Sequence, residues 1–278
     1  MKNTYRACAE INLDALKHNI QEIQAVLGDT KLMCVIKTNA YGHGAVVLAR
    51  ELAAMGAYGF AVATVDEGIE LRNNGIIQPI LVLGFVAKEQ YADMITHHIM
   101  PAIFTYSMAK DFDAVASSMH TVADVHIKLD TGMSRIGFQV TEQSADEIAQ
   151  IAASPNIIIE GIFTHFSKAD ETDKTFTKKQ ADTYEQMITW LKDRQIEIPI
   201  HHISNSAGIV DLPEYNKDIV RAGIILYGLW PSDEVEKNNI DLKPLLSLKS
   251  HVVHVKELEP GRIISYGGTF EVKNRCRL

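Results

Sequence analysis

A lysine follows the first strand-like run of apolar residues in the sequence. Lys37 comes directly after residues 33–36, which contain no polar side chain, so we expect it to project from the end of a buried strand. Burial disfavours the charged ammonium, which suits a lysine that has to attack an aldehyde. The alternative is a lysine that simply reaches water from a strand end. The position therefore indicates carbonyl chemistry if other reactive groups lie nearby.

Other polar residues with catalytic potential occur at or just after the ends of later apolar runs. In a barrel of parallel strands, functional residues come from the carboxyl ends of the strands, so these side chains are expected to meet at one face. They are Lys128 and Asp130 at the fifth run, His165 after the sixth, Asn205 and Ser206 after the seventh, and Arg221 and Gly223 in the eighth.

The apolar runs alternate with segments of helical spacing. An amphipathic helix is expected to begin after Asn12 and to end near Gly28. Further helical segments are 45–55, 66–73, 142–153 and 178–193. The strand-like runs are 32–36, 58–62, 80–83, 100–104, 122–129, 157–163, 200–203 and 219–224. Eight strands that alternate with helices predict an α/β fold, namely a (β/α)8 barrel of the TIM type. An open doubly wound sheet is the alternative.

The pattern of apolar residues changes after Pro244. Residues 245–255 and 263–272 alternate polar and apolar side chains with no helix between them. The pair Gly267 and Gly268 suggests a bend or a bulge. We therefore predict a barrel domain over residues 1–240 and the beginning of an antiparallel β domain over residues 241–278.

Composition excludes several classes of protein. With 46% hydrophobic and 22% charged residues, the chain is typical of a soluble globular protein. A formal net charge of -8 argues against a nucleic-acid or anionic membrane partner and leaves room for a local anion pocket. The cysteines, Cys8, Cys34 and Cys276, are odd in number and widely spaced, which fits a reducing cytoplasm. No apolar run typical of a signal peptide or a membrane span occurs, so we expect a cytoplasmic protein.

Two pairs of adjacent histidines invite a metal-binding interpretation. Adjacent residues on a strand point to opposite faces, and no cysteine or carboxylate is spaced to complete a site. The pairs His97–His98 and His201–His202 are therefore interpreted as structural, and no metal is expected.

The segment around Lys37 carries a specific family signature. Residues 36–44 read IKTNAYGHG. They closely resemble the segment of alanine racemases that binds pyridoxal 5′-phosphate (PLP). The resemblance implies that Lys37 bonds covalently to PLP and that Tyr41 contacts the cofactor phosphate. Gly42 and Gly44 would free the backbone to turn there.

A second segment resembles the same family. Residues 126–138 read HIKLDTGMSRIGF. By resemblance, Arg135 faces the phenolic oxygen of PLP and the carboxylate of a small amino-acid substrate. Lys128 stands where many relatives carry a carbamylated lysine that steadies this arginine. An ordinary surface pair of Lys128 with Asp130 is the alternative.

Three shorter segments complete the resemblance of the barrel: 164–166 (THF), 204–207 (SNSA) and 220–224 (VRAGI). The family assigns the phosphate to Ser206, Gly223 and Ile224, and it counts His165 and Asn205 among the cofactor-binding residues. Without the resemblance, a plain helix cap at residues 204–206 is the better interpretation.

Arg221 is the residue that the family places against the pyridine nitrogen of PLP. A guanidinium cannot accept a proton, so it would leave that nitrogen unprotonated and the ring a weaker electron sink. The carbanion formed at the substrate α-carbon would then be short-lived, which suits racemisation better than transamination. The alternative is a surface ion pair between Arg221 and a nearby acid such as Asp218.

The second catalytic base is expected beyond the barrel. Residues 264–270 (ISYGGTF) resemble the family segment in which Tyr266 is that base. Tyrosine is a weak acid and needs help near neutral pH. By resemblance, His165 and Arg221 supply that help, and Tyr266 reaches the active site of a partner subunit, which implies a homodimer. Read without the resemblance, Tyr266 is an aromatic residue on a strand.

Taken together, the segments resemble the alanine racemase family over residues 9–270. The implied function is a PLP-dependent isomerase that interconverts L-alanine and D-alanine and supplies D-alanine for cell-wall peptidoglycan. Family members continue through a longer β domain than this sequence contains. The alternatives are a non-catalytic PLP-binding barrel and a racemase of another small amino acid such as serine.

Overall fold

The computed structural model describes residues 6–278, which divide into two compact units. The barrel unit is Asn12–Leu245, and the second unit consists of residues 6–11 together with Leu246–Leu278. From the sequence we expected a domain boundary after residue 240, and the barrel unit ends at Leu245. None of the helices in the described part of the chain is long and apolar enough to cross a membrane.

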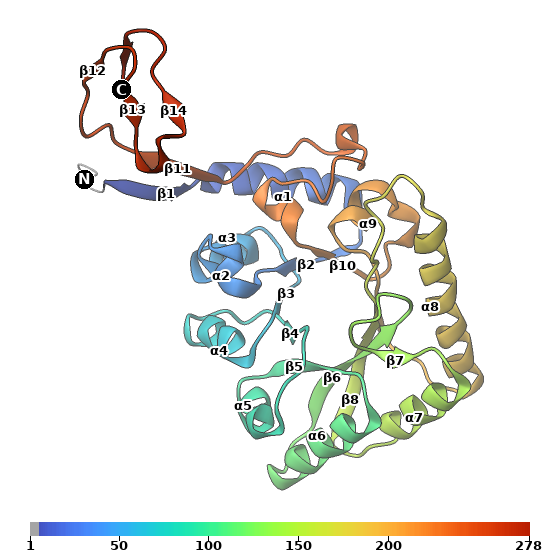
Figure 1. The fold of residues 1–278 in the computed structure, drawn as a ribbon. Coiled ribbons are helices and arrows are strands. Elements are labelled where there is room, and N and C mark those ends of the chain that lie inside the picture. The colour runs from blue at the N-terminus through green and yellow to red at the C-terminus, as the bar shows by residue number, and fades with distance from the viewer. Residues whose placement is uncertain (1–5) are drawn as a thin grey trace. The chain divides into compact units, whose positions relative to one another are not determined.

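The barrel unit is built on parallel strands that follow one another around a ring (Figure 1). Their spatial order is β10-β2-β3-β4-β5-β6-β8-β9, and the short β7 (Phe138–Gln139) pairs with β6. Between β9 and β10 the Arg221 N–H donates to the Ser204 carbonyl over 3.1 Å. The strands are β2 (Lys31–Val35), β3 (Gly59–Val62), β4 (Ile80–Val82), β5 (Ile99–Ile103), β6 (Ala123–Asp130), β8 (Ile157–Phe163), β9 (Ile200–His202) and β10 (Ile219–Ala222).

This arrangement confirms the predicted (β/α)8 barrel, and an open doubly wound sheet is wrong because β10 pairs with β2. Apolar side chains fill the interior, so the barrel is a packed core and not a pore. They include Met33, Val35, Ala61, Leu81, Met100, Ala102, Phe163 and Ile219.

Helices surround the ring of strands (Figure 1). Side-chain caps start several of them: Asn12 accepts from the N–H groups of Asp14 and Ala15, and Thr64 and Glu67 form a capping box. The helices are α1 (Leu13–Leu27), α2 (Lys37–Tyr41), α3 (Ala45–Ala54), α4 (Val65–Asn73), α5 (Tyr91–Thr96), α6 (Tyr106–Ser118), α7 (Glu142–Ala152), α8 (Thr175–Asp193) and α9 (Ser206–Asp211). Short 3-10 turns are Lys88–Gln90, Pro213–Tyr215, Ile224–Tyr227 and Lys237–Asn239.

The second unit contains short antiparallel ladders. β1 (Ala7–Ile11) pairs with β11 (Leu246–Ser250), β12 (Glu257–Leu258) with β15 (Cys276–Arg277), and β13 (Ile263–Ile264) with β14 (Phe270–Glu271). The alternating segment 263–272 is therefore a hairpin and not one strand. It turns at the 3-10 segment Tyr266–Gly268, because Ser265, Gly267 and Gly268 all adopt positive φ.

Candidate active site

A cavity of about 590 Å3 lies at the carboxyl ends of the barrel strands. Residues from the ends of β2, β6, β8, β9 and β10, or from the loops after them, line it. Asp130, which was also expected at this face, is not part of the lining. The other residues predicted from the barrel sequence belong to it: Lys37, Tyr41, Lys128, Arg135, His165, Asn205, Ser206, Arg221, Gly223 and Ile224. The structure therefore brings together side chains that are far apart in the sequence.

The backbone after Lys37 makes a left-handed turn. Thr38, Asn39, Ala40 and Tyr41 have φ values of 56°, 53°, 53° and 51°, although none of them is glycine. Each such residue costs roughly 1–2 kcal/mol relative to the right-handed form. We expected Gly42 and Gly44 to provide the turn, yet it begins before them.

Side chains from neighbouring segments hold this left-handed turn. The Glu67 carboxylate accepts from the N–H of Thr38 over 2.6 Å and from the N–H of Ala63 over 2.7 Å. The Asn39 side chain accepts from the N–H of Ala45 over 2.8 Å. As a result the Tyr41 ring lies 5.8 Å from the Lys37 Nζ, so both reach the same cavity.

Arg221 is buried at the base of the cavity. Its Nη2 donates to the Thr164 carbonyl over 2.7 Å and lies 3.3 Å from His165 Nδ1. Its Nη1 lies 2.9 Å from His202 Nδ1. Burial lowers the pKa of Arg221 to about 9, so the guanidinium still carries its charge at neutral pH. The expected alternative, an ion pair with Asp218, is not formed: Asp218 accepts from the His201 N–H over 2.8 Å.

Donor groups face both ring nitrogens of His165. A guanidinium only donates hydrogen bonds, so His165 Nδ1 accepts in the contact with Arg221, and the Asn205 amide nitrogen lies 3.5 Å from Nε2. Burial and the neighbouring Arg221 charge hold the pKa of His165 well below its usual value. The ring is therefore neutral at physiological pH.

Lys128 is buried within the barrel and not at the surface. Its Nζ donates to the Leu129 carbonyl over 2.9 Å and lies 5.0 Å from the centre of the Phe163 ring. Burial lowers its pKa well below the usual value, and the charges of Arg221 and Arg135 add to this. Asp130 accepts instead from the N–H groups of Gly132 and Ser134, so the proposed surface pair is wrong.

The loop that begins at Asp130 carries Arg135 to the exposed rim of the cavity. Gly137 has a φ of +141°, and a Cβ added to it would lie 2.3 Å from the Asp130 nitrogen. Only glycine allows the chain to pass so close to the end of β6. The loop therefore returns tightly, which places Arg135 among the lining residues.

Ser206 and Gly223 form a small cradle at another side of the cavity. Gly223 N–H donates to Ser206 Oγ over 2.9 Å. A Cβ at Gly223 would lie 3.6 Å from Ser206 Oγ and 3.9 Å from the Tyr41 hydroxyl, so a side chain there would fill the cradle. Asn205 caps α9 by accepting from the Gly208 N–H, as the plain-cap interpretation predicted, and its Nδ2 also lies 3.5 Å from His165 Nε2.

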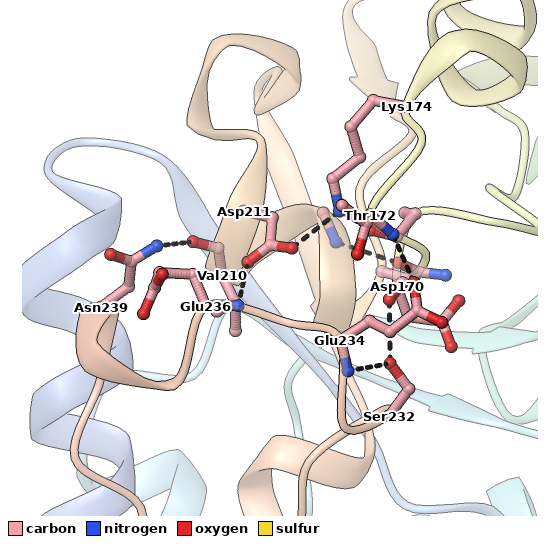
Figure 2. A network of polar contacts seen from close by, with 12 residues as sticks. Asp170, Thr172, Lys174, Val210, Asp211, Ser232, Glu234, Glu236 and Asn239 are labelled. Atoms are coloured by element: carbon pink, nitrogen blue, oxygen red, sulfur yellow. Dashed lines mark hydrogen bonds and ion pairs between the residues drawn. The ribbon is translucent and has the colours of Figure 1, made fainter.

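A polar network ties together two loops near this cavity, whose lining includes Asp170 and Pro231 (Figure 2). The Lys174 ammonium donates to the Asp211 carboxylate over 2.7 Å, and the Ser232 hydroxyl donates to the Asp170 carbonyl over 2.8 Å. The Thr172 N–H donates to Glu234, and Asp211 also accepts from the Glu236 N–H. These contacts hold the loop that follows His165 in one position.

Tyr266 belongs to the second unit, and its side chain is 99% exposed there. It lies in the 3-10 turn of the hairpin and not on a strand, so its interpretation as an ordinary strand residue is wrong.

Some residues of the region escaped the sequence analysis. His202 was interpreted as structural only, yet it contacts Arg221, and its ring stacks on Phe163 with centres 4.6 Å apart. Within residues 6–278, no group of three or more His, Cys, Asp or Glu side chains is arranged to hold a metal ion.

Known proteins resemble the chain over most of its length. Residues 11–231 match the family described as "Alanine racemase, N-terminal domain". The alanine racemase of Clostridium tetani is 46% identical over 265 residues, which are 95% of this chain and 68% of that protein. An alanine racemase structure from Clostridium difficile 630 superposes with a TM-score of 0.94 at 44% identity, covering 99% of this chain and 72% of the other. A histidine racemase from Leuconostoc mesenteroides subsp. sake gives a TM-score of 0.90 at 29% identity, covering 99% and 73%.

Proposed function

The chain belongs to the alanine racemase family, and we propose that it is an isomerase that interconverts L-alanine and D-alanine with PLP as its cofactor. One observation carries the proposal beyond the family relationship. The cationic, hydroxyl and backbone groups expected from the resemblance meet in a single cavity, although they come from five different strand ends.

The cavity fits the phosphate end of PLP. The Ser206 and Tyr41 hydroxyls and the backbone N–H groups of Gly223 and Ile224 are donors around the cradle that a side chain at residue 223 would fill. Lys37, Arg135 and Arg221 add positive charge to the cavity, although the chain as a whole has a formal net charge of -8. An anionic cofactor and an anionic substrate carboxylate are therefore both favoured.

Arg221 would hold the pyridine nitrogen of PLP. Its guanidinium is fixed by His165, His202 and backbone carbonyls, so it can offer a donor and no acceptor to the ring. When bound, PLP supplies a conjugated ring that acidifies the α-proton of the amino acid. Arg221 limits that electron withdrawal, which favours prompt reprotonation at the α-carbon.

Two bases on opposite faces of the α-carbon carry out the inversion. Tyr266 Oη removes the α-proton of L-alanine, and Lys37 Nζ returns a proton from the other face; the residues exchange roles in the reverse direction. A single base would return the proton to the face it came from. His165, which contacts Arg221, is the group proposed to assist Tyr266.

Lys128 has the properties of a lysine that can be carbamylated. Its lowered pKa favours the neutral amine, which can attack carbon dioxide and release a proton. The resulting carbamate would place a negative charge near the Arg135 and Arg221 guanidinium groups. We propose that it steadies Arg135.

We propose further that the protein is a homodimer in which Tyr266 completes the site of the partner subunit. The exposed apolar side chains of the second unit, such as Leu248 and Val252, support a protein partner. The supply of D-alanine for cell-wall peptidoglycan and a cytoplasmic location stay predictions from the sequence.

The proposed activity is tested with the purified 278-residue chain. The chain is incubated with PLP and L-alanine, and D-alanine is followed by chiral chromatography. Formation of D-alanine that Lys37→Ala abolishes would establish the activity. Cofactor absorbance without D-alanine would contradict alanine racemisation and would favour a PLP-binding barrel without that activity.

The same assay decides the side-chain specificity. Because a histidine racemase shares this fold at 29% identity, L-serine and L-histidine are run beside L-alanine at equal concentration. The proposal expects the largest kcat/KM for alanine. A larger value for either other amino acid would assign a different substrate to the same chemistry.

A further inference from the structure

A line of buried hydrogen bonds leads from Arg221 through the barrel wall to a carboxylate. Arg221 Nη1 lies 2.9 Å from His202 Nδ1, and His202 Nε2 lies 2.8 Å from His126 Nδ1. His126 Nε2 in turn lies 3.2 Å from Glu160 Oε2. Both histidines are buried, whereas the Glu160 side chain is 27% exposed and lines a separate cavity of about 210 Å3. We call this series the histidine relay.

The local backbone is shaped to admit the relay. A Cβ added to Gly161 would lie 2.4 Å from the His126 ring, so no other residue type fits beside it without displacing the ring. The register between β6 and β8 also shifts between Val125 and His126. The missing side chain at Gly161 and the register shift together leave the His126 ring the space to contact His202 and Glu160.

The two ends of the relay fix the direction of every hydrogen bond. The guanidinium only donates, so His202 Nδ1 accepts and His202 Nε2 carries the proton. That proton is donated to His126 Nδ1, so His126 is protonated on Nε2 and donates to Glu160, which as a carboxylate only accepts. Burial and the Arg221 charge keep the pKa of His202 well below its usual value, in agreement with a neutral ring.

The relay connects the buried positive charge of Arg221 to a carboxylate. A buried guanidinium normally has a carboxylate partner, because an unpaired buried charge is strongly unfavourable. Among the described residues, no carboxylate forms an ion pair with Arg221; its other acceptors are the carbonyls of Thr164, His202 and Ile203 and the His165 ring. Hydrogen bonds in series polarise one another, so a carboxylate at the far end can act on the near end.

We propose that Glu160 is the remote counter-charge of Arg221 and that, through His126 and His202, it positions the guanidinium at the base of the cavity. Glu160 is a positioning residue, because it touches neither the cavity of Arg221 nor any group that lines it except through the histidines. Its effect on turnover rests on the proposed racemase function; its effect on the two imidazoles does not.

Other ionisable groups surround the outer end of the relay. Asp124 from β6, His98 and Tyr58 lie near Glu160, and burial together with the Glu160 charge raises the pKa of Asp124. Asp124 also lines the 210 Å3 cavity but forms no hydrogen bond with His126. Asp124→Asn is therefore a matched control, since it removes a carboxylate from the same place without removing a hydrogen bond of the relay.

The test is Glu160→Gln in the holoenzyme with 15N-labelled histidine. In the unaltered protein at pH 7.5, the ring nitrogens of His126 and His202 should each show one protonated Nε2 and one unprotonated Nδ1. Glutamine can donate or accept, so the substitution should shift the ring signals of both histidines and release their fixed tautomers. Signals are assigned from their loss in His126→Gln and His202→Gln.

The same variants are then assayed for racemisation. Glu160→Gln should lower kcat about 10-fold and leave KM nearly unchanged, and Asp124→Asn should alter neither the ring signals nor kcat. Wild-type ring signals and wild-type kcat in Glu160→Gln would overturn the proposal, as would a doubly protonated His126 or His202 in the unaltered protein. If the unaltered protein makes no D-alanine, the proposed function fails, and the nitrogen signals alone still decide whether the relay exists.

Discussion

The barrel unit and the second unit differ in how far they bury their apolar side chains. In the barrel, large side chains from helices and strands, such as Leu16, Phe60 and Tyr184, are fully buried. The second unit exposes most of its large apolar residues: Leu246, Leu248, Val252, Val253, Val255, Ile263, Tyr266, Phe270 and Leu278. The barrel is therefore self-contained, whereas the second unit has an apolar surface of the kind that binds a protein partner.

The candidate catalytic groups divide in the same way. The cavity that holds Lys37, Arg135 and Arg221 is built entirely within Asn12–Leu245, whereas the second unit contributes only Tyr266, on an exposed turn. We infer that the barrel binds the cofactor by itself and that the second unit supplies one proton-transfer group. Substitutions in the two regions should therefore have separable effects.

Lys37→Ala should have the largest effect. The variant loses the only side chain proposed to bond to PLP, so racemisation should fall by more than about 1,000-fold and the visible absorbance of the lysine-bound cofactor should disappear. Absorbance spectra and chiral chromatography of the purified protein check this. Retained absorbance would show that a lysine other than Lys37 binds the cofactor.

Tyr266→Phe should separate the two regions most clearly. Loss of one proton-transfer group should lower kcat by roughly 100- to 10,000-fold, while the cofactor absorbance stays as in the unaltered protein. Tyr227→Phe is a matched control of the same chemical change, since the Tyr227 hydroxyl donates to the Val35 carbonyl and is not assigned to proton transfer. Near-normal turnover in Tyr266→Phe would refute the two-base assignment.

Equal truncations should reveal the difference in burial. Leu16 is 0% exposed in the barrel, and Leu248 is 78% exposed in the second unit. Leu16→Ala should lower the free energy of unfolding by about 2–5 kcal/mol, and Leu248→Ala should change it by less than about 0.5 kcal/mol. Urea unfolding at a protein concentration low enough to keep the subunits apart measures both, because a partner subunit would bury Leu248. Similar losses at the two positions would contradict the comparison.

Acid should destabilise the barrel through its buried histidines. The pKa values of His165 and His202 are lowered in the folded protein, so the unfolded chain binds their protons first as the pH falls. Their contribution to stability is complete above pH ~6.5 and is lost as the pH falls from there toward the folded pKa, by about 1.4 kcal/mol per pH unit for each histidine.

Urea unfolding at pH 7.5 and 5.5 checks this dependence. His202→Gln should reduce the loss of stability on acidification, and His254→Gln, at an exposed position of the second unit, should leave it unchanged. An equal loss in all three proteins would assign the acid sensitivity to other groups.

The barrel could be predicted closely because its strands are short apolar runs whose ends agree with the structure; the run 157–163, for example, is β8 (Ile157–Phe163). The left-handed turn at Thr38–Tyr41 could not, since threonine, alanine and tyrosine do not favour positive φ and Glu67 stabilises the turn from another segment. In the second unit, alternation over 263–272 does not give the ends of the two strands, but the pair Gly267 and Gly268 predicted the bend between them.

Ten lining residues of the cavity were also predicted, because they follow strand ends or belong to segments that resemble the family. His202 and its link to Glu160 were not, since the relay joins four strands and no single stretch of sequence contains it. One signal was present: Gly161 interrupts an otherwise apolar run beside Glu160, and an isolated glycine in a strand suggests the close approach of another group.

The central claim is that the barrel of one subunit and Tyr266 of another make one site, and mixing two inactive variants tests it most directly. Lys37→Ala and Tyr266→Phe chains with different tags are co-expressed, and the heterodimer is isolated through both tags. Each heterodimer then has one site with both bases and one with neither, so it should show about half the activity of the unaltered dimer. A heterodimer that forms but shows no more activity than the separate variants would contradict the account.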